Sequence, residues 1–357
     1  MRDPTGRRFC WDLAARWVSG RLGRFTGAGS LCDHPSDHSR APEGDGGAVL
    51  SSAELFCFTG DGFASSIIGK MNETVQPFLK WPGGKRWLAG TIARLVDPTR
   101  TYVEPFLGAG AVFFALQPSK AILSDVNGDL ISAFIAVRDN ADAVIRRLSK
   151  LKINKQTFRE IRTTKPKTVL DRAVRLIYLN RTAFNGIFRV NRDGEFNVPF
   201  GCKKGTKVCD SARLRSCSRA LNGITARSSD FLVALESASS LDALYIDPPY
   251  TVKHANNGFR RYNERIFSWK DQVELALKIN RLAASGAQVV VSNSSHKEVA
   301  ALYLRTNFKA VEVQRSSCMA ADAAYRGKCK ELLLISRSIT ESPNTGAKAL
   351  LAEMAID

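Results

Sequence analysis

The sequence has no apolar run that approaches the length of a membrane span, so it predicts no transmembrane helix. Its first residues carry charges where a secretory signal peptide has a continuous hydrophobic region, and we therefore expect no signal peptide. The eight cysteines include no CxxC pair and follow no disulfide framework, which fits free thiols in a reducing cytoplasm. Cys32, His34 and His38 lack a second pair of ligands, so no metal is expected.

Acidic residues are scarce relative to basic ones. The 357 residues include 52 Lys and Arg against 34 Asp and Glu, a formal net charge of +18. Residues 1–70 contain eight of each sign, so the rest of the chain carries the whole excess. A polyanion is the expected partner, with nucleic acid the commonest, and a merely soluble basic protein is the alternative.

Two parts of the chain differ in pattern. Residues 1–70 are rich in Gly, Ser, Arg, Asp and Pro and show no lasting helical or strand period, which predicts a disordered extension. Met71 opens a segment of different character and is an alternative start of the functional protein. From Gln76 onward, strands alternate with helices, the first helix at about Lys85–Val96. This alternation is typical of a doubly wound, mostly parallel α/β sheet.

Residues 138–227 interrupt the alternating pattern. They carry many basic residues, and residues 181–207 are rich in turns with interleaved aromatic side chains. Residues 188–198 predict a β-hairpin around Arg192–Asp193–Gly194. We therefore expect residues 71–137 and 228–337 to form one domain, residues 138–227 to be an inserted substrate-binding domain, and residues 338–357 to be a tail.

The glycine-containing stretch VEPFLGAG places Glu104 and Pro105 at a strand end. Phe106, Gly108 and Gly110 follow in a tight turn before a helix. Glycines let a ligand approach the backbone, and a helix N-terminus favours negative charge. The spacing is not GxGxxG, which disfavours a nicotinamide or flavin cofactor. Asp125 ends the next strand, where an acid can accept hydrogen bonds from ribose hydroxyls; a helix cap or turn is the alternative.

A second strand end carries the tetrapeptide DPPY, Asp247–Tyr250. It follows the apolar residues Leu244–Ile246, and its two prolines lack the N–H groups that a helix or sheet needs. The chain therefore stops with a carboxylate, a backbone carbonyl and an aromatic ring at the edge where open α/β sheets bind ligands. A simple Asp-Pro turn is the alternative.

Six blocks of the sequence, taken in order along the chain, resemble the successive sequence blocks of the Dam-like, D12-class N6-adenine DNA methyltransferases. The blocks are FLKWPGGK, YVEPFLGAGAVFF, LSDVNGDLI, LNRTAFNGIFRVNRDGEFNVPFG, DALYIDPPY and VVVSNSS, and the resemblance spans about residues 76–336. It implies a Rossmann-like methyltransferase fold that uses S-adenosylmethionine to methylate N6 of adenine in double-stranded DNA. Residues 138–227 would then be the DNA-recognition domain.

The resemblance also implies roles for individual residues. Asp247 and the Pro248 carbonyl would accept hydrogen bonds from the amino group, and Tyr250 would stack on a flipped adenine. The residues expected to contact S-adenosylmethionine are Trp81, Lys85, Glu104, Phe106, Gly108, Gly110, Asp125, Asp230 and Asp247. The residues expected to contact DNA are Lys80, Arg181, Asn185, Ile187, Arg189 and Pro199. Arg189 suits bidentate recognition of a guanine.

The biological setting is left open by these patterns. The hairpin's likeness to Dam-type enzymes suggests a GATC-like site, although Thr182–Phe184 and the stretch after Gly201 depart from the family pattern. We expect a cytoplasmic enzyme that acts alone or beside a restriction endonuclease for the same site. The alternatives are an amino-methyltransferase of RNA or protein, disfavoured by the basic insertion, and a DNA-binding module without catalysis, disfavoured by the intact DPPY.

Overall fold

The structure is a computed structural model of the 357-residue chain. It describes residues 75–81, 83–191, 194–201, 205–250, 267–303, 307–316 and 328–342. The predicted extension 1–70, the Cys32, His34 and His38 group, the turn residues Arg192–Asp193 and most of the tail lie outside the described residues. All described residues belong to one compact unit of the chain.

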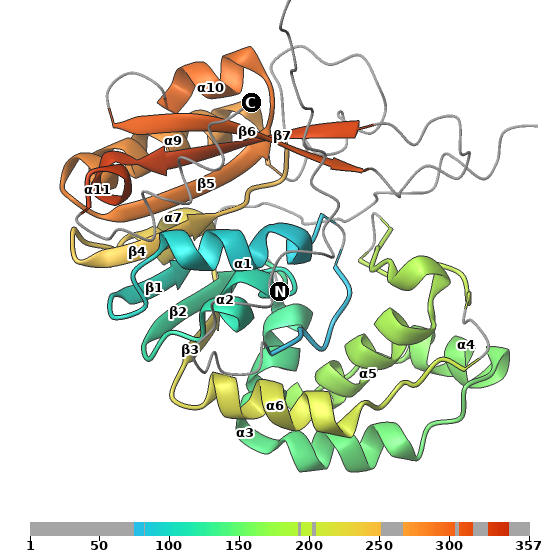
Figure 1. The fold of residues 1–357 in the computed structure, drawn as a ribbon. Helices are drawn as coiled ribbons and strands as arrows, with labels where there is room; N and C mark the ends of the chain where they lie inside the picture. The colour runs from blue at the N-terminus through green and yellow to red at the C-terminus, as the bar shows by residue number, and fades with distance from the viewer. Residues whose placement is uncertain are drawn as a thin grey trace, which may run out of the picture. The chain divides into compact units, whose positions relative to one another are not determined.

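In the described part of the chain, seven strands form one sheet in the order β3-β2-β1-β4-β5-β7-β6 (Figure 1). The strands are β1 (Thr101–Glu104), β2 (Ala121–Asp125), β3 (Thr225–Ser228), β4 (Asp242–Ile246), β5 (Gln288–Ser294), β6 (Phe308–Ser316) and β7 (Lys328–Ser336). Strands β3, β2, β1, β4 and β5 are parallel, and β7 runs antiparallel to both of its neighbours. The predicted doubly wound, mostly parallel α/β sheet is therefore confirmed.

The helices alternate with the strands, as the sequence pattern predicted. They are α1 (Arg86–Leu95), α2 (Ala111–Leu116), α3 (Gly128–Ser149), α4 (Lys155–Thr163), α5 (Val169–Thr182), the 3-10 turn η2 (Phe184–Gly186), α6 (Ser211–Leu221), α7 (Phe231–Leu235), α9 (Trp269–Ala284), α10 (Lys297–Tyr303) and α11 (Arg337–Thr340). Side-chain caps fix several starts: Asn127 accepts two N–H groups of α3, and Ser268 with Asp271 forms a capping box for α9. The helix predicted at Lys85–Val96 is confirmed to within one residue at each end.

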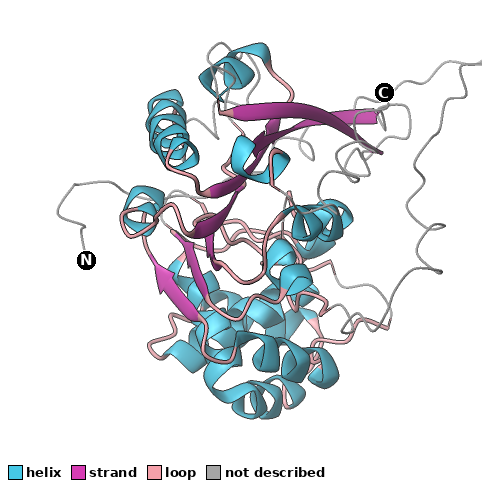
Figure 2. Cartoon of the chain, turned by 60° about the vertical axis from the view of Figure 1, so that its left-hand side comes forward, coloured by secondary structure: helices cyan, strands magenta, loops and turns pink. Residues whose placement is uncertain are grey.

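Successive residues of the central strands enter two different hydrophobic cores, because strand side chains alternate between the faces of a sheet. Tyr245 and Val290 pack with buried residues of α1, α2, α3, α5 and α6. Leu244 and Val291 pack with residues of α7, α9 and α10. Helices thus cover both faces of the sheet, as Figure 2 shows. Because both faces of the central strands are buried, their sequences contain continuous apolar runs.

Helices α4, α5 and α6 occupy the segment predicted as an insertion, and they lie with α3 in the lower part of Figure 1. Helices α5 and α6 pack on α3. The predicted boundary between residues 137 and 138 lies inside α3, close to Asn140, whose φ of −156° and ψ of 68° interrupt the helix. The boundary between residues 227 and 228 lies inside β3. The division into two domains stays a prediction.

The predicted hairpin at residues 188–198 is confirmed over its described residues. Val190 and Phe196 form an antiparallel bridge. On either side of it, Asn191 N donates to Glu195 O at 2.7 Å and Asn197 N donates to Arg189 O at 3.1 Å.

Candidate active site

Three of the acids predicted as site residues lie at the ends of three neighbouring parallel strands. Glu104 ends β1, Asp125 ends β2 and Asp247 directly follows β4. Val103 of β1 is in register with Ile122 of β2 and with Leu244 of β4, so the carboxyl ends of these strands lie side by side. The strand order reverses between β1 and β4, and such a switch point is where open α/β sheets bind ligands.

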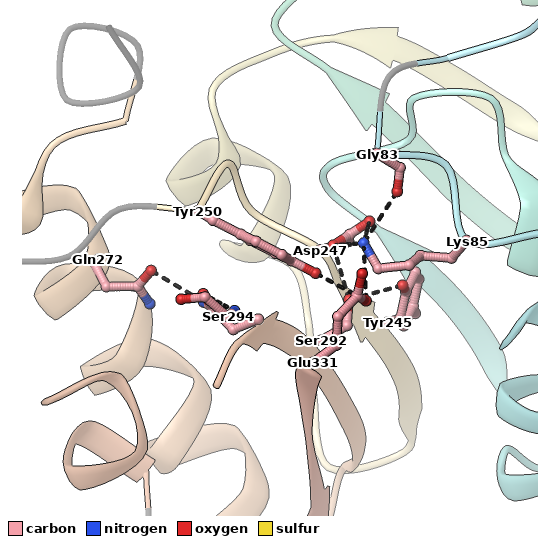
Figure 3. Close-up of polar contacts among 10 residues, drawn as sticks. Gly83, Lys85, Tyr245, Asp247, Tyr250, Gln272, Ser292, Ser294 and Glu331 are labelled. Carbon is pink, nitrogen blue, oxygen red and sulfur yellow. Dashed lines mark hydrogen bonds and ion pairs between the residues drawn. The ribbon is translucent and has the colours of Figure 1, made fainter. Parts of the chain in front are cut away.

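Asp247 is held by two side chains from other elements (Figure 3). Lys85 Nζ, only 4% exposed, lies 2.9 Å from Asp247 Oδ1 and 3.0 Å from Oδ2. Ser292 Oγ, at the end of β5, donates to Oδ1 at 2.8 Å and lies 2.9 Å from the Tyr245 hydroxyl. The carboxylate is 20% exposed, so it is fixed in orientation and still reachable.

Tyr250 lies beside the same ammonium group. Lys85 Nζ is 4.9 Å from the centre of the Tyr250 ring, within the range of a cation–π contact. The Tyr250 hydroxyl donates to Glu331 Oε2 at 3.3 Å. Burial, with smaller contributions from Asp247 and Glu331, raises the pKa of Tyr250 well above its usual value, so the hydroxyl stays protonated and remains a donor.

Three residues of this cluster were not predicted as site residues: Tyr245, Ser292 and Glu331. The VVVSNSS block contained Ser292 without a role. The available signal for Glu331 was a single acid at the start of the apolar run of β7, where an unpaired charge would be costly.

The glycine turn after β1 and the acid after β2 are connected by hydrogen bonds. Asp125 accepts Gly108 N at 3.1 Å and Asn127 N at 2.9 Å. Burial raises the pKa of Asp125 to about 6, and these two hydrogen bonds partly offset the shift. Gly108 and Gly110 have φ of 50° and 66°, which favour glycine. A Cβ at Gly108 would lie 3.0 Å from the Trp81 side chain, so the indole packs directly over this turn.

Other predicted cofactor residues have structural partners in the fold. Glu104 is buried and accepts the Tyr102 hydroxyl at 3.0 Å, and burial raises the pKa of Glu104 well above its usual value. Phe106 stacks on Phe231, with ring centres 5.5 Å apart. Asp230 caps α7 by accepting a backbone N–H at 2.9 Å. Cofactor contacts by these three residues stay predictions.

The predicted DNA-contacting residues gather around η2 and the hairpin. Lys80 is exposed, and its backbone N–H and C=O both bond to the side chain of Asn180, a fully buried residue of α5. The same amide donates to Gly186 O at 3.0 Å, so Asn180 joins the KWPGGK segment to the turn before the hairpin. Trp81 stacks on Phe188 at 5.6 Å, which adds a second connection.

Arg189 is only 7% exposed, and its guanidinium donates to the side chain and the carbonyl of Asn197 on the opposite arm of the hairpin. A guanine contact by Arg189 therefore requires these hydrogen bonds to be exchanged. Arg181 Nε donates to Lys207 O at 3.2 Å, and burial lowers the pKa of Arg181. Pro199 is exposed and Ile187 is half-buried.

The turn residue Asn185 has φ of 53°, in the left-handed region. Asparagine adopts this region more readily than most residues, which fits its place in the tight turn η2.

Three further findings concern membrane helices, metal ligands and cysteines. Among the helices that the structure describes, none has the length and apolar composition needed to cross a membrane. Within the same described ranges, no group of three or more His, Cys, Asp or Glu side chains is placed to hold a metal ion. The cysteine thiols of Cys209 and Cys217 are free.

The mostly parallel sheet with its antiparallel β7, the glycine turn beside Asp125, and DPPY after β4 define a Rossmann-like methyltransferase. A sequence model of the D12 class N6 adenine-specific DNA methyltransferases matches residues 81–317. The chain belongs to this family, and it is an adenine-specific DNA methyltransferase.

Several known proteins are similar to this chain along nearly their whole length. The Type II methyltransferase M1.LlaDCHI of Lactococcus lactis subsp. cremoris is 34% identical over 280 residues, which cover 75% of this chain and 98% of that protein. The Type II methyltransferase M.MjaIII of Methanocaldococcus jannaschii is 33% identical over 266 residues, with coverage of 68% and 92%. The DNA adenine methylase of Escherichia coli K12 is 32% identical over 274 residues, with coverage of 75% and 98%.

Proposed function

We propose that the protein transfers a methyl group from S-adenosylmethionine to N6 of an adenine that has been flipped out of duplex DNA. The observation that carries this proposal is the Asp247 carboxylate, fixed by Lys85 and Ser292 at the switch point of the sheet with Tyr250 beside it. A fixed acceptor next to an aromatic face suits a planar base that presents an amino group.

The glycine turn and its neighbours fit the proposed cofactor. Each oxygen of Asp125 accepts one backbone N–H and has lone-pair capacity left for a ribose hydroxyl. Ser229 Oγ, next to Asp230, is shielded from solvent and has no hydrogen-bond partner among the described residues. A buried hydroxyl of this kind is available to a ligand. Trp81, Lys85, Gly108 and the N-terminus of α2 complete the proposed cofactor side of the site.

S-adenosylmethionine, when bound, supplies an electrophilic methyl group on a sulfonium. Adenine N6 is a weak nucleophile because its lone pair is delocalised into the ring. Asp247 and the Pro248 carbonyl would accept the two N6–H groups and thereby favour a more tetrahedral nitrogen. Tyr250 would stack on the extruded ring and hold it in place. Fixed positions for both reacting groups lower the entropic part of the barrier.

Residues 138–227 are proposed to recognise the DNA. Arg181 and Asn185 would contact phosphates, and Lys80, which precedes this segment, would reach a base or a phosphate. Arg189 would recognise a guanine after releasing Asn197. Ile187 and Pro199 would add apolar contacts. The likeness of the hairpin to Dam-type enzymes supports a GATC-like site as the first sequence to test.

Two further parts of the proposal concern the setting. We infer a cytoplasmic location because the substrate is DNA. A restriction endonuclease for the same site is a candidate partner, since two of the relatives are named Type II methyltransferases.

The decisive experiment offers the purified chain S-adenosylmethionine with a labelled methyl group together with duplex DNA, RNA or protein. We expect label only in duplex DNA, recovered as N6-methyladenine, and no label with Asp247→Ala. Label in RNA or protein, or none with any substrate, would refute the proposal. Mapping the modified adenines would then identify the target sequence.

A further inference from the structure

Strand β7 brings a buried carboxylate, Glu331, into the active site. Glu331 is 3% exposed, and the four residues that follow it, Leu332–Ile335, are all buried. Because β7 runs antiparallel to β5, the register places Glu331 opposite Ser294, at the carboxyl end of β5 where the site lies. A buried carboxylate is tolerated only where partners compensate for lost water.

Those partners belong to the active site (Figure 3). Glu331 Oε2 accepts the Tyr250 hydroxyl at 3.3 Å and lies 3.7 Å from Lys85 Nζ. The same ammonium group contacts both oxygens of Asp247. One carboxylate on a distant strand therefore connects to both functional ends of DPPY, to the ring directly and to the acid through Lys85.

This arrangement addresses a mechanical problem at Tyr250. The two prolines fix the backbone before Tyr250, but they leave the side chain free to rotate about its own bonds. An aromatic ring that must stack on an incoming base works better when its rotamer is already fixed, because ordering it during binding costs conformational entropy. A hydrogen bond at the far end of the ring, to a buried acceptor, restricts that rotation.

We propose that Glu331 is a positioning residue for methyl transfer. It holds the Tyr250 ring in the orientation that receives the target adenine, and it holds Lys85 between Tyr250 and Asp247. The inference rests on the proposed role of Tyr250 in stacking on the flipped base. No contact between Glu331 and the substrate is required.

The test compares Glu331→Ala, Glu331→Gln and Tyr250→Phe in the full chain, with duplex DNA and S-adenosylmethionine. Glu331→Ala is expected to lower kcat about 10–100-fold, the range that a misplaced reacting group produces, with little change in cofactor affinity. Glu331→Gln keeps an acceptor for the hydroxyl and should recover most of that loss. The matched control is Glu312→Gln on β6, whose carboxylate is 38% exposed and pairs with Lys330; it should behave as wild type.

Two further readouts separate positioning from a general loss of structure. If Glu331 acts through the hydroxyl, the double variant Glu331→Ala/Tyr250→Phe should be no slower than Glu331→Ala alone. With 2-aminopurine at the target position, Glu331→Ala and Tyr250→Phe should both give brighter fluorescence than wild type, because a loosely held ring quenches the flipped base less.

The results distinguish a wrong assignment of Glu331 from a wrong proposed function. Wild-type kcat in folded Glu331→Ala, or multiplicative losses in the double variant, would overturn the assignment. If Glu331→Ala does not fold, Tyr250→Phe decides: unchanged kcat and fluorescence would overturn it, and the expected changes would support it. A failure of the wild type and of Glu312→Gln to methylate DNA would instead refute the proposed function.

Discussion

The carboxyl of Asp125 gives a quantitative test of the cofactor side of the site. Its pKa is raised by burial from 3.8 to about 6. Between these values, the folded protein keeps a proton that the unfolded chain has released. The free energy of unfolding therefore falls as the pH rises from about 4 to 6, and the difference in pKa corresponds to about 3 kcal/mol. This contribution is fully present below pH 4 and lost above pH 6.

The perturbation is Asp125→Asn, which removes the titration. The amide turns its own NH2 toward one of the two backbone donors, Gly108 or Asn127, so the variant carries a constant penalty. The quantity to measure is therefore how the difference in free energy of unfolding between wild type and Asp125→Asn changes with pH. Urea unfolding from pH 4 to 7 should show wild type losing about 3 kcal/mol relative to Asp125→Asn across this range.

A control with the opposite sign is available in Asp97. Hydrogen bonds from the N–H and hydroxyl of Thr99 lower the pKa of Asp97, so its contribution to stability is present at neutral pH and lost in acid. Relative to Asp97→Asn, wild type should thus gain stability as the pH rises. A flat difference curve for Asp125→Asn would show that the buried carboxyl does not titrate as described.

The same titration should appear in cofactor binding. Ribose hydroxyls need the ionised form of Asp125 as acceptor, so the affinity of wild type for S-adenosylmethionine should fall up to about tenfold per pH unit below 6. Asp125→Asn should bind weakly and without this dependence. Calorimetry that finds constant wild-type affinity from pH 5 to 7 would remove Asp125 from the cofactor site.

Three further predictions concern the proposed DNA-recognition region and its connection to Lys80. Arg189→Ala should lose about 1–3 kcal/mol of discrimination at one base pair, measured as kcat/KM on single-substitution duplexes; equal loss on every duplex would indicate a phosphate contact instead. Asn180→Ala removes the buried bonds to Lys80 and should lower the free energy of unfolding by about 2–4 kcal/mol, so an unchanged urea midpoint would contradict that bridging role. Gly201→Ala would place a Cβ 2.4 Å from Phe184 Cα, so it should weaken DNA binding without changing the affinity for the cofactor. Wild-type DNA affinity in this variant would show that the backbone shifts to accommodate the methyl group.

Strands could be predicted from the sequence where helices cover both faces of the strand and where turn-forming residues mark its end. The strand before DPPY is apolar from Ala243 to Ile246 and is followed by Asp247 and two prolines, and β2 (Ala121–Asp125) begins with an apolar run and ends in an aspartate, so both strands could be predicted. Strand β3 (Thr225–Ser228) was missed because it has no fully buried residue and no apolar alternation. It lies at the edge of the sheet because it pairs with β2, and this pairing cannot be inferred from the residues of β3 alone.

The edge of the predicted insertion was also hard to place. Helix α3 (Gly128–Ser149) packs on β2 and β3 of the sheet as well as on α5 and α6, and its buried residues run from Leu130 to Leu148. Its apolar pattern therefore continues through the predicted boundary at residue 138. The departure from helical geometry at Asn140 is local and leaves no mark on that pattern. Composition alone therefore does not define the residue at which the predicted insertion begins.

In the candidate active site, some residues could be predicted from the local sequence and others are brought in by strands that are distant in the sequence. Asp247 and Tyr250 could be predicted because the prolines between them impose their geometry locally. Glu331 lies 81 positions after Tyr250, and it reaches the site only because β7 inserts between β5 and β6 in the reverse direction. A parallel strand there would point its opposite end toward the substrate. The reversed direction of β7 therefore brings a buried carboxylate into contact with Tyr250 and Lys85, and this contact follows from the sheet topology and not from the local sequence.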